Sequence, residues 1–278
     1  MNKLNVGCGN RIHPEWVNVD FVAVNSAVKA HDLRKGIPYP QDYFDCVYHS
    51  HVLEHLPKKS AGYFMRECFR VMKWGGILRV VVPDLEKIAR GYLEALEKAS
   101  SGSPGWDENY EWMLLELYDQ TVRERSYGDL VDYFRRVTIP NWDFVYQRWG
   151  VQAKILLKHF TEQAAQEAPA STPRRNAWGY VFRNPGSVLK HKLVRALLGK
   201  EDWEALQVGK FRREGEIHFW MYDAYSLRKL LQETGFRQIR QCDADDSFIP
   251  AWTGFNLDTE PDGTVYKPDS LYMEAQKL

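Results

Sequence analysis

The sequence predicts an α/β protein whose sheet is mostly parallel. Short apolar runs with the pattern of strands alternate with stretches of helical periodicity in the first hundred residues, and the alternation resumes near the end of the chain. This order of elements is typical of a parallel sheet that is covered on both faces. The candidate strands are residues 3–6, 16–20, 28–32, 44–49, 77–82, 236–241 and 270–275.

The positions of the helices between these strands are predicted from the spacing of apolar residues and from the residues that begin or end a helix. Apolar residues recur at three- and four-residue spacing over residues 61–72, and the glycine pair 75–76 predicts the end of that helix. Asp84 and Asp223 are each expected to cap a helix, because an aspartate side chain accepts hydrogen bonds from the free amides of a first turn. Gly235 is expected to end the helix that Asp223 begins.

A stretch between the two sheet-forming blocks is expected to be a mainly helical insertion. Helical periodicity is present over residues 112–125 and 130–136, whereas residues 164–175 have the composition of a loop. We therefore divide the chain into a first part of the sheet domain (1–99), a helical insertion that forms a lid or substrate region (100–215), and a last part of the sheet domain (216–278).

Composition and charge exclude several classes of protein. The chain has 278 residues with 37 basic and 37 acidic side chains, so it lacks the positive excess of a general nucleic-acid binder. No apolar run is long enough to span a bilayer, and residues 1–10 have no apolar secretory signal, so we expect a cytoplasmic protein with no membrane partner. Four scattered cysteines predict reduced thiols rather than disulfides.

Two stretches have a strong local charge. Residues 174–213 hold ten Lys and Arg against three acids, and residues 243–262 hold six acids and no base. Each could be a solvated face, the two could attract one another, or the basic stretch could form a rim for an anionic substrate.

A glycine-containing turn follows the first strand. Residues 4–10 read LNVGCGN, and glycines at such a turn let backbone amides approach a ligand closely. Asp20 ends the second strand, where an acid can accept hydrogen bonds from both ribose hydroxyls. A dinucleotide site would need a third glycine and a full helix before that acid, and residues 10–15 are too few for one. The sequence therefore predicts a nucleoside ligand without phosphates and disfavours a nicotinamide cofactor.

These motifs, in this order and spacing, resemble those of class I S-adenosylmethionine-dependent methyltransferases. The resemblance is closest to a compact subgroup with a shortened first helix and a GCG…W-x-N-x-D opening. It implies a Rossmann-like, seven-stranded methyltransferase sheet with S-adenosylmethionine as cofactor. The matching segments are residues 4–9, Asp20, 31–33, 44–56, 75–84, 218–236 and 267–275.

The resemblance also implies roles for individual residues. Gly7, Cys8 and Gly9 would contact the methionine moiety through their backbone, and Asp20 would bind the ribose. The remaining members of the implied cofactor site are Asp32 at the adenine amino group, Leu33 beside it, Ser50 and His51 on the sulfonium side, and Asn5 and Phe21. The chain departs from the family at Asn5, where many members have an acid, and in having no third glycine after Gly9.

His51, His55 and His218 are the candidate catalytic residues. Residues 51–55 have the H-x-x-E-H form of zinc peptidases, but that motif needs a helix around it, and here a strand precedes it and Pro57 follows. Some small-RNA and ubiquinone-pathway O-methyltransferases resemble the chain at Glu54-His55 and bind a divalent ion there with a later histidine, a position that His218 occupies. We favour a site without metal, in which His218 or His51 takes a proton from the acceptor hydroxyl.

The predicted function is therefore S-adenosylmethionine-dependent methyl transfer. By analogy with the family, the acceptor is expected to be an oxygen of a small metabolite, sugar or peptide. Two alternatives are a catalytically inactive cofactor-binding regulatory or scaffold protein and a metal-assisted O-methyltransferase. The oligomeric state is left open.

Overall fold

The computed structural model describes residues 1–167 and 185–278, and its centre is one seven-stranded sheet in the order β3-β2-β1-β4-β5-β7-β6. Strand β7 is antiparallel to both of its neighbours, and the other pairs are parallel. The predicted fold class is thus confirmed. The strands are β1 (Lys3–Val6), β2 (Val17–Asp20), β3 (Val28–Ala30), β4 (Phe44–Ser50), β5 (Met72–Pro83), β6 (Arg237–Cys242) and β7 (Ser270–Gln276).

One face of the sheet is covered by two amphipathic helices, α1 (Lys58–Val71) and α10 (Ala224–Thr234). Their apolar sides, represented by Phe64 and Leu227, pack with strand residues such as Val47 and Val80 in one buried cluster. Because side chains alternate across a strand, the neighbours of Val47 point to the opposite face.

The opposite face of the sheet is covered by a segment without α-helices. This differs from the expectation that helices cover both faces. The segment 243–266, with the short 3-10 helix η4 (Trp252–Phe255), packs its apolar side chains against Cys46 and Tyr48 of β4. The links from β1 to β2 and from β2 to β3 contain no helix, so they leave this face of the sheet open for the later segment.

Buried arginine explains why this acidic segment lies on the sheet. Arg79 of β5 is fully buried, and its Nε lies 2.7 Å from Asp258 Oδ2. Two more acids of the segment pair with partly exposed arginines, Glu260 with Arg11 at 2.8 Å and Asp246 with Arg240 at 2.8 Å. The partners of these three acids thus lie outside the basic stretch 174–213, part of which lies outside the described residues. The other three acids, Asp243, Asp245 and Asp262, are exposed, as is Asp246.

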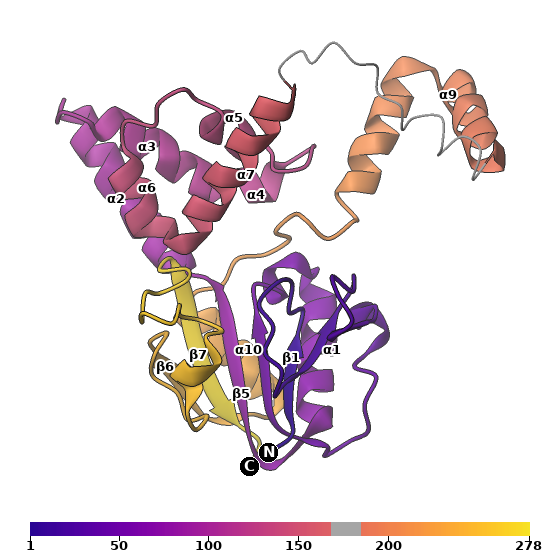
Figure 1. Cartoon of the computed structure of the whole chain (residues 1–278), viewed down its shortest axis with the longest axis vertical. Coiled ribbons are helices and arrows are strands. Elements are labelled where there is room, and N and C mark those ends of the chain that lie inside the picture. The colour runs from indigo at the N-terminus through magenta and orange to yellow at the C-terminus, as the bar shows by residue number, and fades with distance from the viewer. Residues whose placement is uncertain (168–184) are drawn as a thin grey trace.

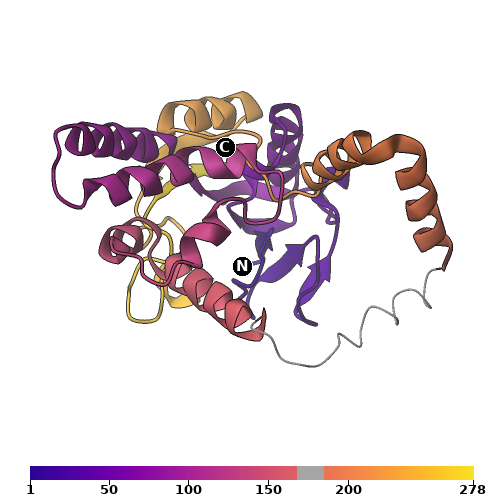
Figure 2. The same cartoon turned by 90° about the horizontal axis from the view of Figure 1, so that it is seen from above.

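The helices between β5 and α10 have a hydrophobic core of their own, built around Trp112, Phe134 and Phe160. It includes Ile88 and Ala95 of α2, which the sequence analysis grouped with the first part of the sheet domain. The elements are α2 (Leu85–Ser100), α3 (Trp106–Leu114), the π-helical η3 (Leu115–Asp119), α4 (Gln120–Val122), α5 (Leu130–Phe134), α6 (Trp142–Trp149), α7 (Val151–Glu167) and α9 (Pro185–Phe211). Figure 1 shows α2 to α7 above the edge of the sheet at which β5 ends, while α9 extends away from both parts (Figures 1 and 2).

Two predicted boundaries were wrong. The helix expected to stop at the glycine pair 75–76 ends at Val71, because Met72 is already extended and opens β5, with Gly75 inside the strand at φ 79°. The loop expected over 164–175 is helical up to Glu167, where α7 ends, and its remainder lies outside the described residues.

Other local predictions were confirmed. Asp84 accepts hydrogen bonds from the amides of Glu86 and Lys87, and Asp223 forms a capping box with Ser226. Gly235 ends α10 in the left-handed conformation. All four cysteines are free and buried.

Among the described helices, none is both long and apolar enough to cross a membrane.

Candidate active site

A cavity of about 270 Å³ lies where β4 and β5 end and the helical part begins. This is the edge of a parallel sheet at which α/β proteins bind their ligands. The cavity brings together the three histidines that the sequence singled out, His51, His55 and His218. Its wall is completed by Pro83, Gln120, Arg123, Ser126, Tyr127, Leu130, Trp149, Gln152, Leu156, Glu216, Lys267 and Asp269.

Backbone hydrogen bonds hold His218 beside Glu54 and His55, although it is more than 160 residues away in the chain. The amide of Phe219 donates to the carbonyl of Glu54 at 2.8 Å, in the 3-10 helix η2 (Leu53–His55). The amide of His218 donates to the carbonyl of Gln120 at 2.9 Å, which ties the same segment to α4. His218 is thus clamped between the sheet edge and the helical part.

The tautomer of His55 follows from its hydrogen bond. Its Nδ1 lies 3.1 Å from the carbonyl oxygen of Ile217, and a carbonyl can only accept, so Nδ1 carries the proton. The lone pair of the ring is then on Nε2. The rings of His55 and His218 meet edge to face, with centroids 4.7 Å apart.

His51 is held by both of its ring nitrogens. Nε2 lies 3.0 Å from Ser270 Oγ, and Nδ1 lies 3.0 Å from Glu54 Oε1. Its backbone is left-handed, with φ 54°, and the amide donates to the carbonyl of Val81 at 2.9 Å. A left-handed histidine costs free energy and persists where the surroundings demand it, a pattern that concentrates at functional sites.

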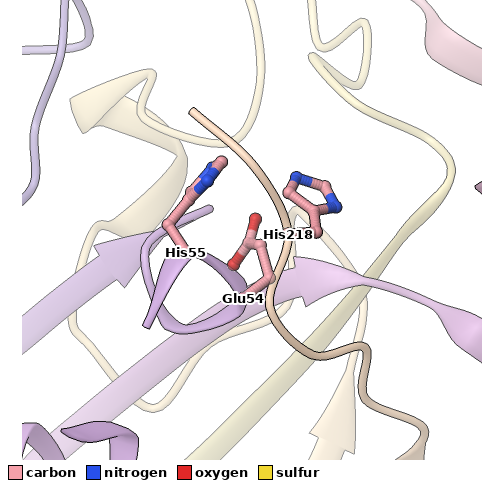
Figure 3. A group of neighbouring side chains, drawn as sticks. All are labelled: Glu54, His55 and His218. Atoms are coloured by element: carbon pink, nitrogen blue, oxygen red, sulfur yellow. The ribbon is translucent and has the colours of Figure 1, made fainter. Parts of the chain in front are cut away.

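Glu54 is the buried carboxyl of the site. It is fully buried, neither carboxylate oxygen has an aligned hydrogen bond, and burial raises its pKa. Figure 3 shows this carboxyl between the rings of His55 and His218, and one ligand atom from each of the three lies within 4.8 Å of the others. Two imidazoles and a carboxylate could accept a borderline divalent ion.

Burial and nearby charges lower the pKa of two of the cavity imidazoles, His51 and His218. Burial holds the pKa of His218 well below its usual value, and the nearby His55, His51 and Lys267 lower it further. Burial also lowers the pKa of Lys267 and raises that of Asp269 to about 7. The sequence analysis did not single out Lys267 or Asp269 as functional, because they precede β7, whereas Asp20 drew attention by ending β2.

The turn after β1 has the openings that a bound nucleoside requires. Gly9 is left-handed with nothing within 4 Å of where a Cβ would be, and its amide donates to Asp20 Oδ2 at 2.8 Å. Phe21 beside it is 61% exposed. Gly7 instead packs against Val52, whose Cγ2 would lie 2.2 Å from an added Cβ. This contact places the cavity residue His51 next to the turn.

The other residues of the implied cofactor site differ in their exposure and in their existing hydrogen bonds. Asp32 caps the 3-10 helix η1 (Leu33–Lys35), and its two oxygens pair with Arg34 at 2.8 and 3.1 Å. An adenine amino group would have to share this carboxylate with the guanidinium. Asn5 is buried, and its amide donates to the carbonyl of Arg11 and to Asn18, so its side chain shapes the turn from behind. Cys8 is buried, and Leu33 and Ser50 are half-buried.

The fold and the turn define a nucleoside-binding α/β domain with one antiparallel strand near the edge of its sheet. Residues 4–80 match the sequence model of a family described as "Methyltransferase domain". The match covers this part of the chain alone; with the sheet order it supports the predicted S-adenosylmethionine-dependent methyltransferase, with S-adenosylmethionine as the cofactor. No curated protein sequence matches the chain.

Several solved structures are similar in part. A SAM-dependent methyltransferase from Archaeoglobus fulgidus is 12% identical, with a TM-score of 0.36, 99% of this chain covered and 86% of that one. A possible histamine N-methyltransferase from Thermotoga maritima is 9% identical, with a TM-score of 0.36 and coverages of 100% and 82%. The [4+2]-cyclase SpnF is 24% identical over 29% of this chain and 38% of its own, with a TM-score of 0.24. These scores are too low to carry an argument about function.

Proposed function

We propose that the protein transfers a methyl group to a hydroxyl oxygen of a small acceptor bound in the cavity, with His55 as the general base. The observation that carries this proposal is the hydrogen bond from His55 Nδ1 to Ile217, which leaves the Nε2 lone pair to receive a proton. His218 supports the same role as a second neutral imidazole on the wall. His51, with both ring nitrogens in contact, is proposed to position Glu54 rather than to act as the base.

The chain's own residues would bind, orient and deprotonate the acceptor. The cofactor supplies an electrophilic methyl group on its sulfonium. With the cofactor bound, the acceptor oxygen would form a bond to the methyl carbon as the carbon–sulfur bond breaks, and His55 Nε2 would take the hydroxyl proton; the products would be a methyl ether and S-adenosylhomocysteine. Holding the acceptor beside the turn of Gly7 and Gly9 supplies much of the acceleration. The cofactor roles of Gly7, Cys8, Gly9, Asp20, Phe21, Asp32, Leu33 and Ser50 remain part of this proposal.

The helical part is proposed to act as the lid and the acceptor-selecting wall. Gln120, Arg123, Trp149 and Leu156 come from it and line the cavity together with the histidines. The protein is proposed to act in the cytoplasm, because four free buried thiols suit a reducing compartment.

Single-residue variants test the base. His55→Ala should lower the rate of methyl transfer by about 10²–10⁴ while S-adenosylhomocysteine binds with unchanged affinity. His13→Ala is the control, because His13 packs on Phe255 and does not line the cavity. The acceptor for the assay would come from a screen of metabolites with methyl-labelled cofactor. Unchanged activity in His55→Ala and in His218→Ala would remove the general-base mechanism and leave proximity alone.

A metal-assisted reaction is the second candidate, and one observation favours it. Glu54 is fully buried beside His55 and His218, and neither of its carboxylate oxygens has an aligned hydrogen bond. If these three residues hold an ion that orients the acceptor oxygen, the purified protein should contain near-stoichiometric metal and a chelator should abolish turnover. Substitution of any of the three should then be similarly damaging. A chelator without effect would remove this candidate.

If S-adenosylhomocysteine binds but no acceptor of any class is methylated, the remaining function would be that of a cofactor-binding regulatory or scaffold protein.

A further inference from the structure

Several polar groups on the cavity wall already have partners in the protein. Arg123 Nε lies 2.6 Å from Asp119 Oδ2, and its Nη1 lies 3.1 Å from Glu216 Oε1. Glu216 also accepts a hydrogen bond from Ser126 Oγ at 2.7 Å. Gln152 Oε1 accepts from the hydroxyl of Tyr266 at 2.8 Å. These contacts hold the wall together and use part of the hydrogen-bonding capacity of these side chains.

Three polar groups on the same wall have no partner among the described residues. Asp269 Oδ1 and Trp149 Nε1 are buried without a hydrogen bond, in side chains that are each 8% exposed. Lys267 is only partly buried, and in the described part of the chain its amine forms no ion pair or hydrogen bond. A buried polar group without a partner costs about 1–3 kcal/mol, so such groups are usually satisfied by a ligand or by water.

The three groups need both donors and acceptors from a ligand. Asp269 Oδ1 accepts when ionised, whereas Trp149 Nε1 can only donate and Lys267 donates when charged. A carboxylate ligand could not satisfy the ionised Asp269, and an ammonium ligand could satisfy neither Trp149 nor the charged Lys267. A hydroxyl can do both. Lys267 and Asp269, two residues apart, also carry opposite charges when both are ionised. Their charges then cancel, so the pair does not favour a ligand of either charge.

The rest of the wall fits a ring with an apolar face. Trp149, Leu130 and Leu156 supply aromatic and aliphatic surface from the helical part. A volume of about 270 Å³ is just below the roughly 300–1,000 Å³ of pockets for drug-sized ligands, which suits one small ring rather than an extended chain.

From these observations we infer that the acceptor is a neutral, polyhydroxylated ring such as a single sugar unit, recognised by Asp269, Lys267 and Trp149. This inference rests on the proposed function and narrows its acceptor to one chemical class. Trp149 and the two residues before β7 are thereby specificity-determining, whereas His55 acts on the hydroxyl that reacts.

Binding to the complete protein saturated with S-adenosylhomocysteine tests the inference. The probes are methyl glycosides of neutral hexoses and pentoses, compared with the corresponding hexuronates and hexosamines, whose rings are similar but charged. Calorimetry should show that at least one neutral glycoside binds at least tenfold more tightly than its charged counterparts. Methyl transfer to the same compounds, followed with labelled cofactor, gives a second readout.

Conservative variants test the three residues. Trp149→Phe keeps the aromatic surface and removes only the N–H, so it should weaken the neutral glycoside about threefold to tenfold, and Asp269→Ala should weaken it about tenfold or more. Lys267→Met keeps the aliphatic stem and should also weaken it. Trp252→Phe is the matched control, because its Nε1 donates to the carbonyl of Ala244 outside the cavity. S-adenosylhomocysteine affinity should be equal in all four, which shows that each variant is folded.

Two results would overturn the inference and leave methyl transfer standing. One is preferential binding and methylation of an acidic or amino compound, and the other is Trp149→Phe and Asp269→Ala binding the neutral glycoside as tightly as the native protein. Absence of binding by every neutral glycoside would also overturn it. Failure of the proposed function looks different: S-adenosylhomocysteine binds, but no compound of any class is methylated.

Discussion

Gly7→Ala tests the geometry that joins the cofactor turn to the cavity. An added methyl at residue 7 meets two obstacles, a left-handed φ of 67° and Val52 Cγ2 at 2.2 Å. The left-handed conformation costs an alanine about 1–2 kcal/mol, and overpacking costs about 1–3 kcal/mol more, so we expect the free energy of unfolding to fall by about 2–5 kcal/mol.

Gly9→Ala is the matched control in the same turn. Its φ of 51° imposes a similar conformational cost, but nothing lies within 4 Å of the new methyl, so we expect a loss of only about 1–2 kcal/mol. Both variants restrict the unfolded chain equally, so that contribution cancels between them.

Urea denaturation of the two variants measures the difference, and Val52→Ala supplies a rescue. Combined with Gly7→Ala, it should recover the part of the loss that comes from overpacking, about 1–3 kcal/mol. Equal losses for Gly7→Ala and Gly9→Ala, or no recovery in the double variant, would refute the contact between Val52 and the turn as the reason for a glycine at residue 7.

Three further predictions follow from other parts of the molecule. Asp20→Ala should weaken S-adenosylhomocysteine by about 1–3 kcal/mol in calorimetry, through loss of a charge-assisted ribose contact, and binding of NADH instead would contradict the cofactor assignment. The folded pKa of Asp269, about 7, lies above its usual 3.8, so the stability gained from its protonated form is present below about pH 4 and lost as the pH rises through about 7. Asp269→Asn should therefore become more stable relative to the native protein as the pH rises from about 4 to about 7. If the free energies of unfolding of the two proteins changed in parallel with pH, the prediction would be wrong. Arg79→Leu should lower the free energy of unfolding by about 3–5 kcal/mol, because it leaves the buried carboxylates of Asp258 and Glu274 uncompensated. Arg90→Leu is the control, because it removes an exposed ion pair and should lower the free energy of unfolding by under about 1 kcal/mol. Similar losses in the two variants would contradict this prediction.

The sheet and its cofactor edge could be predicted because their signals are local. Strand and helix periods are read within a few turns of chain, and the caps at Asp84 and Asp223 involve residues two or three positions away. Parallel strands end at one edge of a sheet, so a glycine turn after β1 and an acid after β2 had to lie side by side. The histidines could be singled out by residue type, but not placed.

Only the tertiary structure decided what covers the sheet and what completes the cavity. Arg79 pairs with Asp258 across 179 residues, and that pairing brings an acidic segment onto a face where helices were expected. His218 reaches Glu54 through backbone hydrogen bonds that no side-chain pattern encodes. Trp149 and Asp269 meet at one cavity because the helical part docks on the edge of the sheet. Contacts between residues so far apart in the chain produce no periodic pattern in the sequence, because the segment between the two partners can vary without changing the contact. Such contacts can therefore be recognised only in the folded structure.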